Sequence, residues 1–259
     1  RYLTSDIDVY TLNCLYGFKV VGSVDNGAFG TSLSSAGNVN GDSFDDFIVG
    51  ASNCAAAGRS FAGIAYLVFG RSQFNCSLST ASLGEPGFLG VQYLGAEAGD
   101  SFGNSVSPVG DFNHEGYDDF VVGAHRAGKD SNGSAYVIFG KAVFSSSIVD
   151  MAEFTTGAHT GIKVVGVDAN DYCGEDVGGG YDVNGDLAPD VIISASGAYS
   201  HAGGAFVLFG TPPDTPTSQP TSQPSDQPSS QPIGQPSSKP TSQPSHLPTS
   251  EPSSQPSSS

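Results

Sequence analysis

The sequence predicts an all-β protein made of repeated, blade-like units and followed by a disordered tail. Three observations predict this fold class. Short apolar runs alternate with clusters of Gly, Asn and Asp, which is typical of strands joined by tight turns. Long stretches within residues 1–210 align with one another, and the composition changes abruptly after about residue 211. We therefore divide the chain into a repeat region, 1–210, and a tail, 211–259.

Three aligned stretches define the repeat: "AFGTSLSSAGNVNGDSFDDFIVGAS", "SFGNSVSPVGDFNHEGYDDFVVGAH" and "YCGEDVGGGYDVNGDLAPDVIISAS". Each is followed by another apolar run, "GIAYLVFG", "GSAYVIFG" or "GGAFVLFG", and these runs end at Gly70, Gly140 and Gly210, 70 residues apart. A further strand-like run, "GFKVVG", "GVQYLG" or "GIKVVG", precedes each unit. Four short strands per unit is the pattern of β-propeller blades.

The three units cover about 17–94, 95–166 and 167–210. They give two whole blades and a third that lacks its outer strand, preceded by an unassigned strand near residues 18–22. This strand would complete the third blade in a closed ring, but a closed propeller needs about four to eight blades. We therefore expect about three blades of a larger propeller. An open arc would expose apolar blade faces unless a partner covers them.

Each unit carries a loop rich in side-chain oxygens between its first and second strands. We call these the first, second and third acidic loops (residues 38–46, 111–119 and 182–190). Oxygen donors stand at loop positions 1, 3, 5 and 9, with a main-chain carbonyl at position 7, which suits Ca²⁺ better than Mg²⁺. The expected ligands are Asn38, Asn40, Asp42, Phe44 and Asp46 in the first loop, Asp111, Asn113, Glu115, Tyr117 and Asp119 in the second, and Asp182, Asn184, Asp186, Ala188 and Asp190 in the third.

The alternative interpretation is that Asp, Asn and Gly simply form turns at these places. Three loops in register, each ending in aspartate at position 9, favour metal sites instead. The first loop has the fewest carboxylates and is the weakest of the three sites. The loops are not EF-hands, because position 12 is Val49, Val122 or Ile193 rather than glutamate.

The order "FG", then "NVNGDSFDD", then "GA" resembles the FG-GAP repeats of the β-propeller of integrin α chains, over roughly residues 17–210. The resemblance implies calcium-stabilised blades of a seven-bladed propeller, in a cell-surface or secreted protein that acts in adhesion or ligand recognition.

Several positions depart from the family pattern. Cys173 replaces the motif phenylalanine, and Ser194 replaces the glycine found at Gly50 and Gly123. Leu187 stands where glycine is more usual, at position 6 of the third acidic loop. The proline of the GAP motif is missing from all three repeats.

Strand alternation assigns the connections to two faces. The acidic loops share one face with the connections between third and fourth strands, and the remaining connections share the opposite face. The resemblance implies a protein or glycan ligand on that opposite face, with calcium in a structural role. Candidate recognition loops are 52–61, 125–132 and 196–201, with acidic turns around Asp25, Asp100 and 168–171. An ordinary solvated loop is the alternative for each.

The four cysteines form no CxxC pair, so we expect neither a zinc site nor a thioredoxin-like motif. Their number leaves two disulfides or four free thiols open. The face assignment places Cys14 and Cys76 on the acidic-loop side and Cys54 and Cys173 on the other side. A Cys54–Cys76 bond is therefore disfavoured by distance, and Cys14–Cys76 is easier. N-glycosylation sequons occur at Asn75 and Asn132.

We expect no enzymatic activity. "GDSFG", residues 99–103, matches the G-x-S-x-G nucleophile elbow, which needs a strand-to-helix turn. Ser101 instead aligns with Ala28 and Tyr172 of the other repeats, and no amphipathic helix follows it. The histidines show no ligand or triad spacing, and the paired carboxylates all lie in the acidic loops.

The net charge of −17 disfavours nucleic acid as a partner, because no basic stripe is present to displace counterions. No apolar run is long enough to span a membrane. The chain begins at Arg1 without a signal-peptide pattern, so we expect a processed end or a fragment, with any membrane anchor in missing sequence. A proline recurs at every fourth position from Pro216 to Pro256, which predicts a disordered, extended spacer.

We therefore expect a calcium-binding, extracellular or cell-surface propeller for adhesion or ligand recognition. Two alternatives stay open. One is an accessory propeller of a secreted enzyme, as in glycosylphosphatidylinositol phospholipase D. The other is a structural surface or wall glycoprotein.

Overall fold

The computed structural model describes residues 9–10, 12, 16–84 and 90–213. All of them belong to one compact unit, residues 1–215. The prediction of a disordered tail falls on residues 214–259 and lies outside the described residues, as does Cys14.

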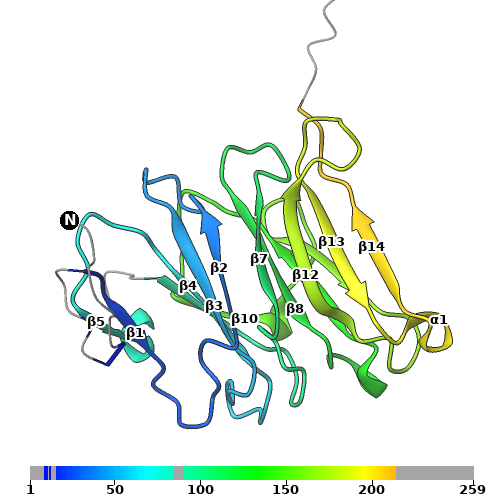
Figure 1. Cartoon of the computed structure of the whole chain (residues 1–259), viewed down its shortest axis with the longest axis horizontal. Coiled ribbons are helices and arrows are strands. Elements are labelled where there is room, and N and C mark those ends of the chain that lie inside the picture. Colours follow the sequence, from blue (N-terminus) through cyan, green and yellow to red (C-terminus); the bar gives the residue numbers. More distant parts are fainter. Residues whose placement is uncertain (1–8, 11, 13–15, 85–89, 214–259) are drawn as a thin grey trace, which may run out of the picture. The chain divides into compact units, whose positions relative to one another are not determined.

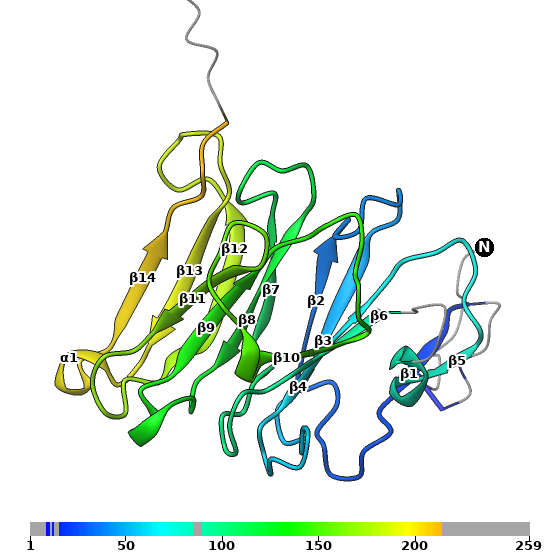
Figure 2. The same ribbon diagram turned by 180° about the vertical axis from the view of Figure 1, so that it is seen from behind.

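The described residues form sheets that lie side by side (Figures 1 and 2). Blade 1 has the order β2–β3–β4–β6, blade 2 has the order β7–β8–β9–β11, and blade 3 has the order β12–β13–β14. The blade strands are antiparallel and span Ser32–Gly37, Asp46–Ala51, Ile64–Val68 and Gly90–Leu94 in blade 1, Val106–Gly110, Asp119–Ala124, Ser134–Ile138 and Gly161–Val165 in blade 2, and Cys173–Tyr181, Asp190–Ala195 and Gly204–Leu208 in blade 3. The all-β fold class with propeller blades is confirmed.

The strand that precedes blade 1 is β1 (Lys19–Val21), and it pairs in parallel with β5 (Ser77–Ser79). β10 (Ile148–Asp150) pairs in the same way with β6, the outer strand of blade 1. β5 and β10 were not foreseen from the sequence, because their three residues are too short to show a period. Single 3₁₀ turns follow them at Thr80–Gly84 and Met151–Glu153.

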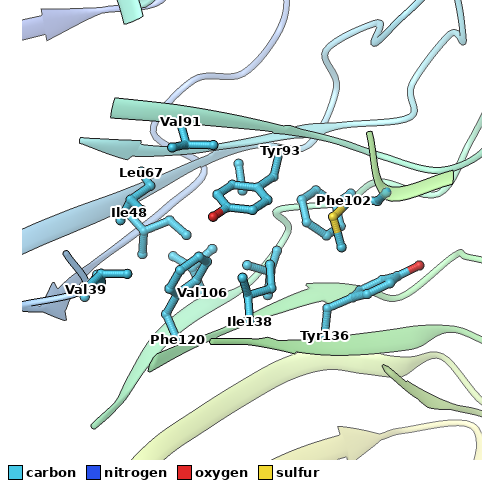
Figure 3. Packing of buried hydrophobic residues seen from close by; sticks show 14 of the residues in the cluster. Val39, Ile48, Leu67, Val91, Tyr93, Phe102, Val106, Phe120, Tyr136 and Ile138 are labelled. Atoms are coloured by element: carbon cyan, nitrogen blue, oxygen red, sulfur yellow. The ribbon is translucent and has the colours of Figure 1, made fainter. Parts of the chain in front are cut away.

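Blades pack face to face through two apolar clusters. In Figure 3, Ile48, Leu67 and Tyr93 of blade 1 face Phe120 and Ile138 of blade 2, and all five are buried. The equivalent cluster between blades 2 and 3 includes buried residues of β8, β9, β12 and β13. Burying one such side chain contributes about 1.5–3 kcal/mol, so the interfaces between blades carry much of the stability.

Glycine is required where the blades approach most closely. A Cβ on Gly50 would lie 1.9 Å from the carbonyl oxygen of Gly103, and a Cβ on Gly123 would lie 2.1 Å from that of Gly174. Gly50 and Gly123, the glycines of the "GA" motif, therefore allow the blades to pack closely, since the backbone of the next blade occupies the space that a side chain would need. Ser194 holds the equivalent position in blade 3, the last blade among the described residues.

Two single-turn elements lie in the connections between second and third strands. η2 (Lys129–Ser131) belongs to blade 2 and α1 (Ala198–His201) to blade 3, at the ends of the strands away from the second and third acidic loops (Figure 1). Tyr199 and Ser200 within α1 have φ values of 55° and 58°, so α1 is a turn and not a regular helix. No helix among the described residues is long and apolar enough to cross a membrane.

Candidate metal centres and the opposite face

The three acidic loops share one backbone conformation. Each follows a β-bulge near the end of the first blade strand and leads into β3, β8 or β13. Positions 4 and 6 have positive φ in every loop. The residues concerned are Gly41 and Ser43 (φ 73° and 79°), His114 and Gly116 (57° and 94°), and Gly185 and Leu187 (79° and 72°). This conformation lets the side-chain oxygens of positions 1 and 3 bond to the main chain of the same loop.

Side-chain oxygens at positions 1 and 3 converge on one point in each loop, the amide nitrogen of position 5. In the second loop, Asp111 Oδ1 and Asn113 Oδ1 accept from the N–H of Glu115 at 2.9 and 3.2 Å. In the third loop, Asp182 Oδ1 and Asn184 Oδ1 both lie 3.0 Å from the amide nitrogen of Asp186.

The first loop repeats the arrangement at 3.1 and 2.9 Å, with Asn38 and Asn40 bonded to the amide of Asp42. The expected ligand oxygens of positions 1 and 3 are thus brought together in every loop, at the main-chain N–H of position 5. The position 7 residues Phe44, Tyr117 and Ala188 lie beside the glycine that follows the third strand of their own blade.

The aspartate at position 9 has a role that the sequence did not reveal. Asp119 is fully buried, and its two oxygens accept from the N–H groups of Phe112 and Gly140 at 2.9 and 2.8 Å. Asp46 and Asp190 make the same pair of bonds, to Val39 and Gly70 and to Val183 and Gly210. The position 9 carboxylate therefore ties its loop to the end of the blade's third strand. The 70-residue spacing of these glycines was the only sequence signal for the tie.

Burial dominates the electrostatics of two of these aspartates. Desolvation raises the pKa of Asp119 to about 7, although its two backbone hydrogen bonds act in the opposite direction. Desolvation likewise raises the pKa of Asp46 to about 6. A bound cation would favour the ionised carboxylate, which is the form that can ligate a metal.

The donor sets fit a hard cation in chemistry, since each loop combines carboxylate, amide and main-chain oxygens. In the described part of the chain, no three or more His, Cys, Asp or Glu side chains are grouped as a metal site. Any site in these loops therefore depends on Asn and main-chain oxygens in addition to the carboxylates.

The opposite face carries a pocket of about 400 Å³ between blades 2 and 3. It is lined by His125, Arg126, Ser131, Tyr172, Glu175 and Ser196. These residues include parts of two of the loops that the sequence singled out for recognition, 125–132 and 196–201. Nδ1 of His125 is buried without a hydrogen-bond partner, and burial lowers the pKa of this imidazole, with Arg126 adding to the effect.

The carboxylates in the acidic turns on this face accept hydrogen bonds from main-chain N–H groups. Asp171 Oδ2 accepts from the N–H groups of Val167 and Asp168 at 3.0 and 2.9 Å. Asp100 is buried and accepts from the N–H of Glu97 at 2.9 Å. One oxygen of each of these carboxylates thus holds its turn in place.

The cysteines and sequons lie as follows. Cys54 and Cys173 are free and buried, and Cys76 is disulfide-bonded. This agrees with the expectation that Cys54 and Cys76 do not pair. Asn75 is exposed, whereas Nδ2 of Asn132 donates to the carbonyl of Gly166 at 2.8 Å.

The family model named FG-GAP repeat matches residues 29–68 and 102–138, which are the first three strands of blades 1 and 2. These two stretches of the chain are FG-GAP repeats. The third repeat lies outside the two matched ranges, yet its acidic loop makes the same hydrogen bonds as the other two.

The chain is similar to several integrin α chains. Integrin alpha pat-2 of Caenorhabditis briggsae is 34% identical over 113 residues, which are 42% of this chain and 9% of the relative. Integrin alpha-IIb of Mus musculus is 32% identical over 179 residues, 66% of this chain and 15% of the relative. Integrin alpha-PS5 of Drosophila melanogaster is 32% identical over 112 residues, 43% and 10%. The chain therefore spans only 9 to 15% of the length of these relatives.

Proposed function

We propose that this chain is the calcium-binding, non-catalytic propeller part of an extracellular or cell-surface protein for adhesion or ligand recognition. The curated relatives are integrin α chains, and the FG-GAP repeat model matches two of this chain's blades. The repeat region, 1–210, would form the recognition domain, with the proline-rich residues 211–259 as a spacer.

Calcium would be held by the oxygens at positions 1, 3, 5, 7 and 9 of each acidic loop. A divalent cation supplies positive charge there, and that charge neutralises the clustered carboxylates of a chain with net charge −17. The convergence of the position 1 and position 3 oxygens in all three loops supports this assignment. The chain's own contribution is to hold the loop closed through the position 9 aspartate.

The pocket beside His125 carries the recognition proposal. The strand connections place it on the face away from the acidic loops, it joins two blades, and it contains an imidazole nitrogen without a partner. Arg126 and Glu175 put opposite charges in its lining, so a protein or glycan with paired polar groups fits it better than a purely apolar ligand. Of the two sequons, Asn75 is the better acceptor for a glycan, because Asn132 would have to release Gly166 first.

A binding screen tests the recognition role. The full chain, in calcium, is applied to arrays of acidic, basic and neutral peptides and of glycans. Arg126→Ala and Tyr172→Ala should reduce binding of any positive probe at least tenfold, because both residues line the pocket. Lys141→Ala changes a cation on the acidic-loop side and should leave binding unchanged. Binding that is lost with Lys141 but survives the two pocket variants would overturn the assignment of faces.

A further inference from the structure

A largely apolar pocket, which we call the aromatic pocket, lies beside the second acidic loop. Its volume is about 540 Å³, within the range of roughly 300–1,000 Å³ that is usual for ligand sites. Phe112 and Phe139 of blade 2 line it together with Ile162 of β11, and Thr211 borders it after the end of β14. It shares no lining residue with the pocket beside His125, which lies on the opposite face.

The equivalent place between blades 1 and 2 shows how this chain fills such a pocket. Lys141 donates its N–H to the carbonyl of Val39, at position 2 of the first acidic loop, at 2.9 Å. Thr211 donates in the same way to Phe112, at position 2 of the second acidic loop, at 2.8 Å. Lys141 and Thr211 are therefore structurally equivalent, and the sequences that begin with them, "KAVF" and "TPPD", can be compared position by position.

The second repeat supplies a phenylalanine that the third repeat lacks. Phe144, three residues after Lys141, packs its ring against Phe69, with 5.2 Å between the ring centres, and joins the apolar cluster between blades 1 and 2. Phe139 is the equivalent of Phe69, since each directly follows the third strand of its blade. The third repeat has aspartate at the position of Phe144, and Phe139 borders the aromatic pocket. A phenyl ring is therefore the group that this fold uses to fill such a place.

A cation accompanies this phenylalanine in the first and second repeats. The guanidinium carbon of Arg71 lies 5.5 Å from the ring centre of Phe74, and Nζ of Lys141 lies 5.1 Å from that of Phe144. Both cations stand three residues before their ring, in "RSQF" and "KAVF". The negative face of an aromatic ring attracts a cation placed over it. The third repeat has neither the cation nor the ring at these positions.

The charge around the aromatic pocket favours a cationic occupant. Glu115 and Asn113 of the second acidic loop line it, and the described residues that line it include neither lysine nor arginine. The net charge of the chain is −17, and even three calcium ions would leave it strongly negative. Such a charge attracts cationic segments and raises their association rate.

We propose that the aromatic pocket binds a partner protein through a segment with lysine or arginine three residues before phenylalanine. The phenyl ring of the partner packs against Phe139, as Phe144 packs against Phe69, and the cation lies over that ring. The second repeat of this chain is thus the template for the ligand. This site goes beyond the proposed recognition pocket, because it lies on the other face and consists of other residues.

Peptide binding to the full chain tests the proposal. The probe is the fluorescein-labelled peptide "GKAVFSS", which copies residues 140–146, and fluorescence anisotropy in 2 mM calcium and 150 mM NaCl measures its dissociation constant. Changing its phenylalanine to alanine should weaken binding at least tenfold, because the anchoring aromatic side chain is lost. Changing its lysine to serine should weaken binding about threefold. A peptide with the lysine and the phenylalanine exchanged has the same composition and charge, and it should bind at least tenfold more weakly.

Variants of the chain locate the site. Ala158 lines the aromatic pocket at an exposed position, so Ala158→Asp should fold normally and weaken peptide binding at least tenfold. Ala152→Asp adds the same charge at an exposed alanine outside the pocket and is the matched control. Phe139→Leu keeps an apolar side chain but removes the ring, and it should weaken binding about threefold. Arg126→Ala alters the recognition pocket and should leave binding of this peptide unchanged.

Three results would overturn the proposal. The first is the absence of saturable binding up to about 1 mM, where even a weak specific site is detected. The second is equal binding of the original and the exchanged peptide, which would show that charge alone attracts them. The third is an equal loss of binding in Ala158→Asp and Ala152→Asp, which would place the peptide elsewhere. None of these results depends on the recognition pocket, so the proposed function is tested separately.

Discussion

At the residue scale, backbone conformation decides which side chains the acidic loops tolerate. Position 6 has positive φ in all three loops, and only Gly116 of the second loop is a glycine there. Leu187 adopts φ 72° in the third loop with a side chain that is 73% exposed, so it gains little packing in return for the strain. This explains physically why glycine is more usual at the position.

Replacing Leu187 with glycine should stabilise the protein. Relief of the left-handed strain contributes about 1–2 kcal/mol, partly offset by the greater freedom of glycine in the unfolded chain, so we expect a net gain of about 0.5–1 kcal/mol. Urea unfolding in EGTA measures it. Val183→Gly, in the same loop but without positive φ, is the control and should destabilise. A loss of stability in Leu187→Gly would show that the leucine packs usefully.

The half-buried imidazole of His125 should make stability depend on pH. Burial holds its pKa below the ordinary value of 6.5, so the folded state disfavours the protonated form. The contribution is fully present above pH 6.5 and is lost as the pH falls toward the lowered folded pKa. Melting temperatures between pH 5 and 7.5 should fall less steeply in His125→Gln. The exposed His159, changed to Gln, should leave the slope as it is. Equal slopes in all three proteins would count against the shift.

At the element scale, each acidic loop is closed by its position 9 aspartate, and under the proposed function calcium would complete it. The two tasks are separable, because Asp119 is buried between two backbone amides whereas Asp111 bonds only to exposed amides of its own loop. The hydrogen bonds of Asp119 should therefore persist when no metal is bound. Asp111, in contrast, should contribute mainly when calcium is bound.

Thermal and urea unfolding of the full chain, with 2 mM calcium and with excess EGTA, should separate these roles. Calcium at 100 times its dissociation constant adds about 2.7 kcal/mol per site. Asp111→Ala should remove one site's calcium response and cost about 1 kcal/mol in EGTA. Asp119→Ala should remove the same response but cost about 2–4 kcal/mol in EGTA, since two buried N–H groups lose their acceptor.

Either half of that prediction can fail independently. No stabilisation by calcium in the unaltered chain would mean that the loops are turns only. Equal losses for the two variants in EGTA would mean that Asp119 has no closing role.

At the scale of the whole molecule, the acidic loops also connect the blades. Asp118 of blade 2 accepts from the N–H of Asn38 in the first acidic loop at 2.7 Å, and Lys141 donates its N–H to the carbonyl of Val39 at 2.9 Å. The N–H of Thr211 bonds in the same way to the carbonyl of Phe112 at 2.8 Å. A loop that orders its own blade therefore also holds the next one.

Removing one of these contacts should weaken the whole repeat region. Asp118→Ala should lower the free energy of unfolding by about 1–2 kcal/mol, because a part-buried N–H loses a charged acceptor. Asp45 occupies the same loop position in blade 1, is exposed, and is the matched control, with an expected change below about 0.5 kcal/mol. Urea unfolding compares them, and equal effects would show that the contact between the blades contributes little.

The sequence by itself determined the all-β class, the four-strand repeat and the identity of the outer strands. These follow from period, spacing and turn chemistry, which are local properties that recur three times. It also identified Cys173 and Ser194 as departures from the repeat pattern.

Only the tertiary structure decided which residues that are far apart in the sequence contact each other, and what those contacts do. The position 9 aspartates bond to glycines 20 to 24 residues away. The "GA" glycines are required by the backbone of another blade, and β5 and β10 each pair in parallel with a strand from elsewhere in the sequence, β1 and β6. Such contacts leave almost no local signal, because the partner that selects the residue is distant in sequence and meets it only after the blades have packed.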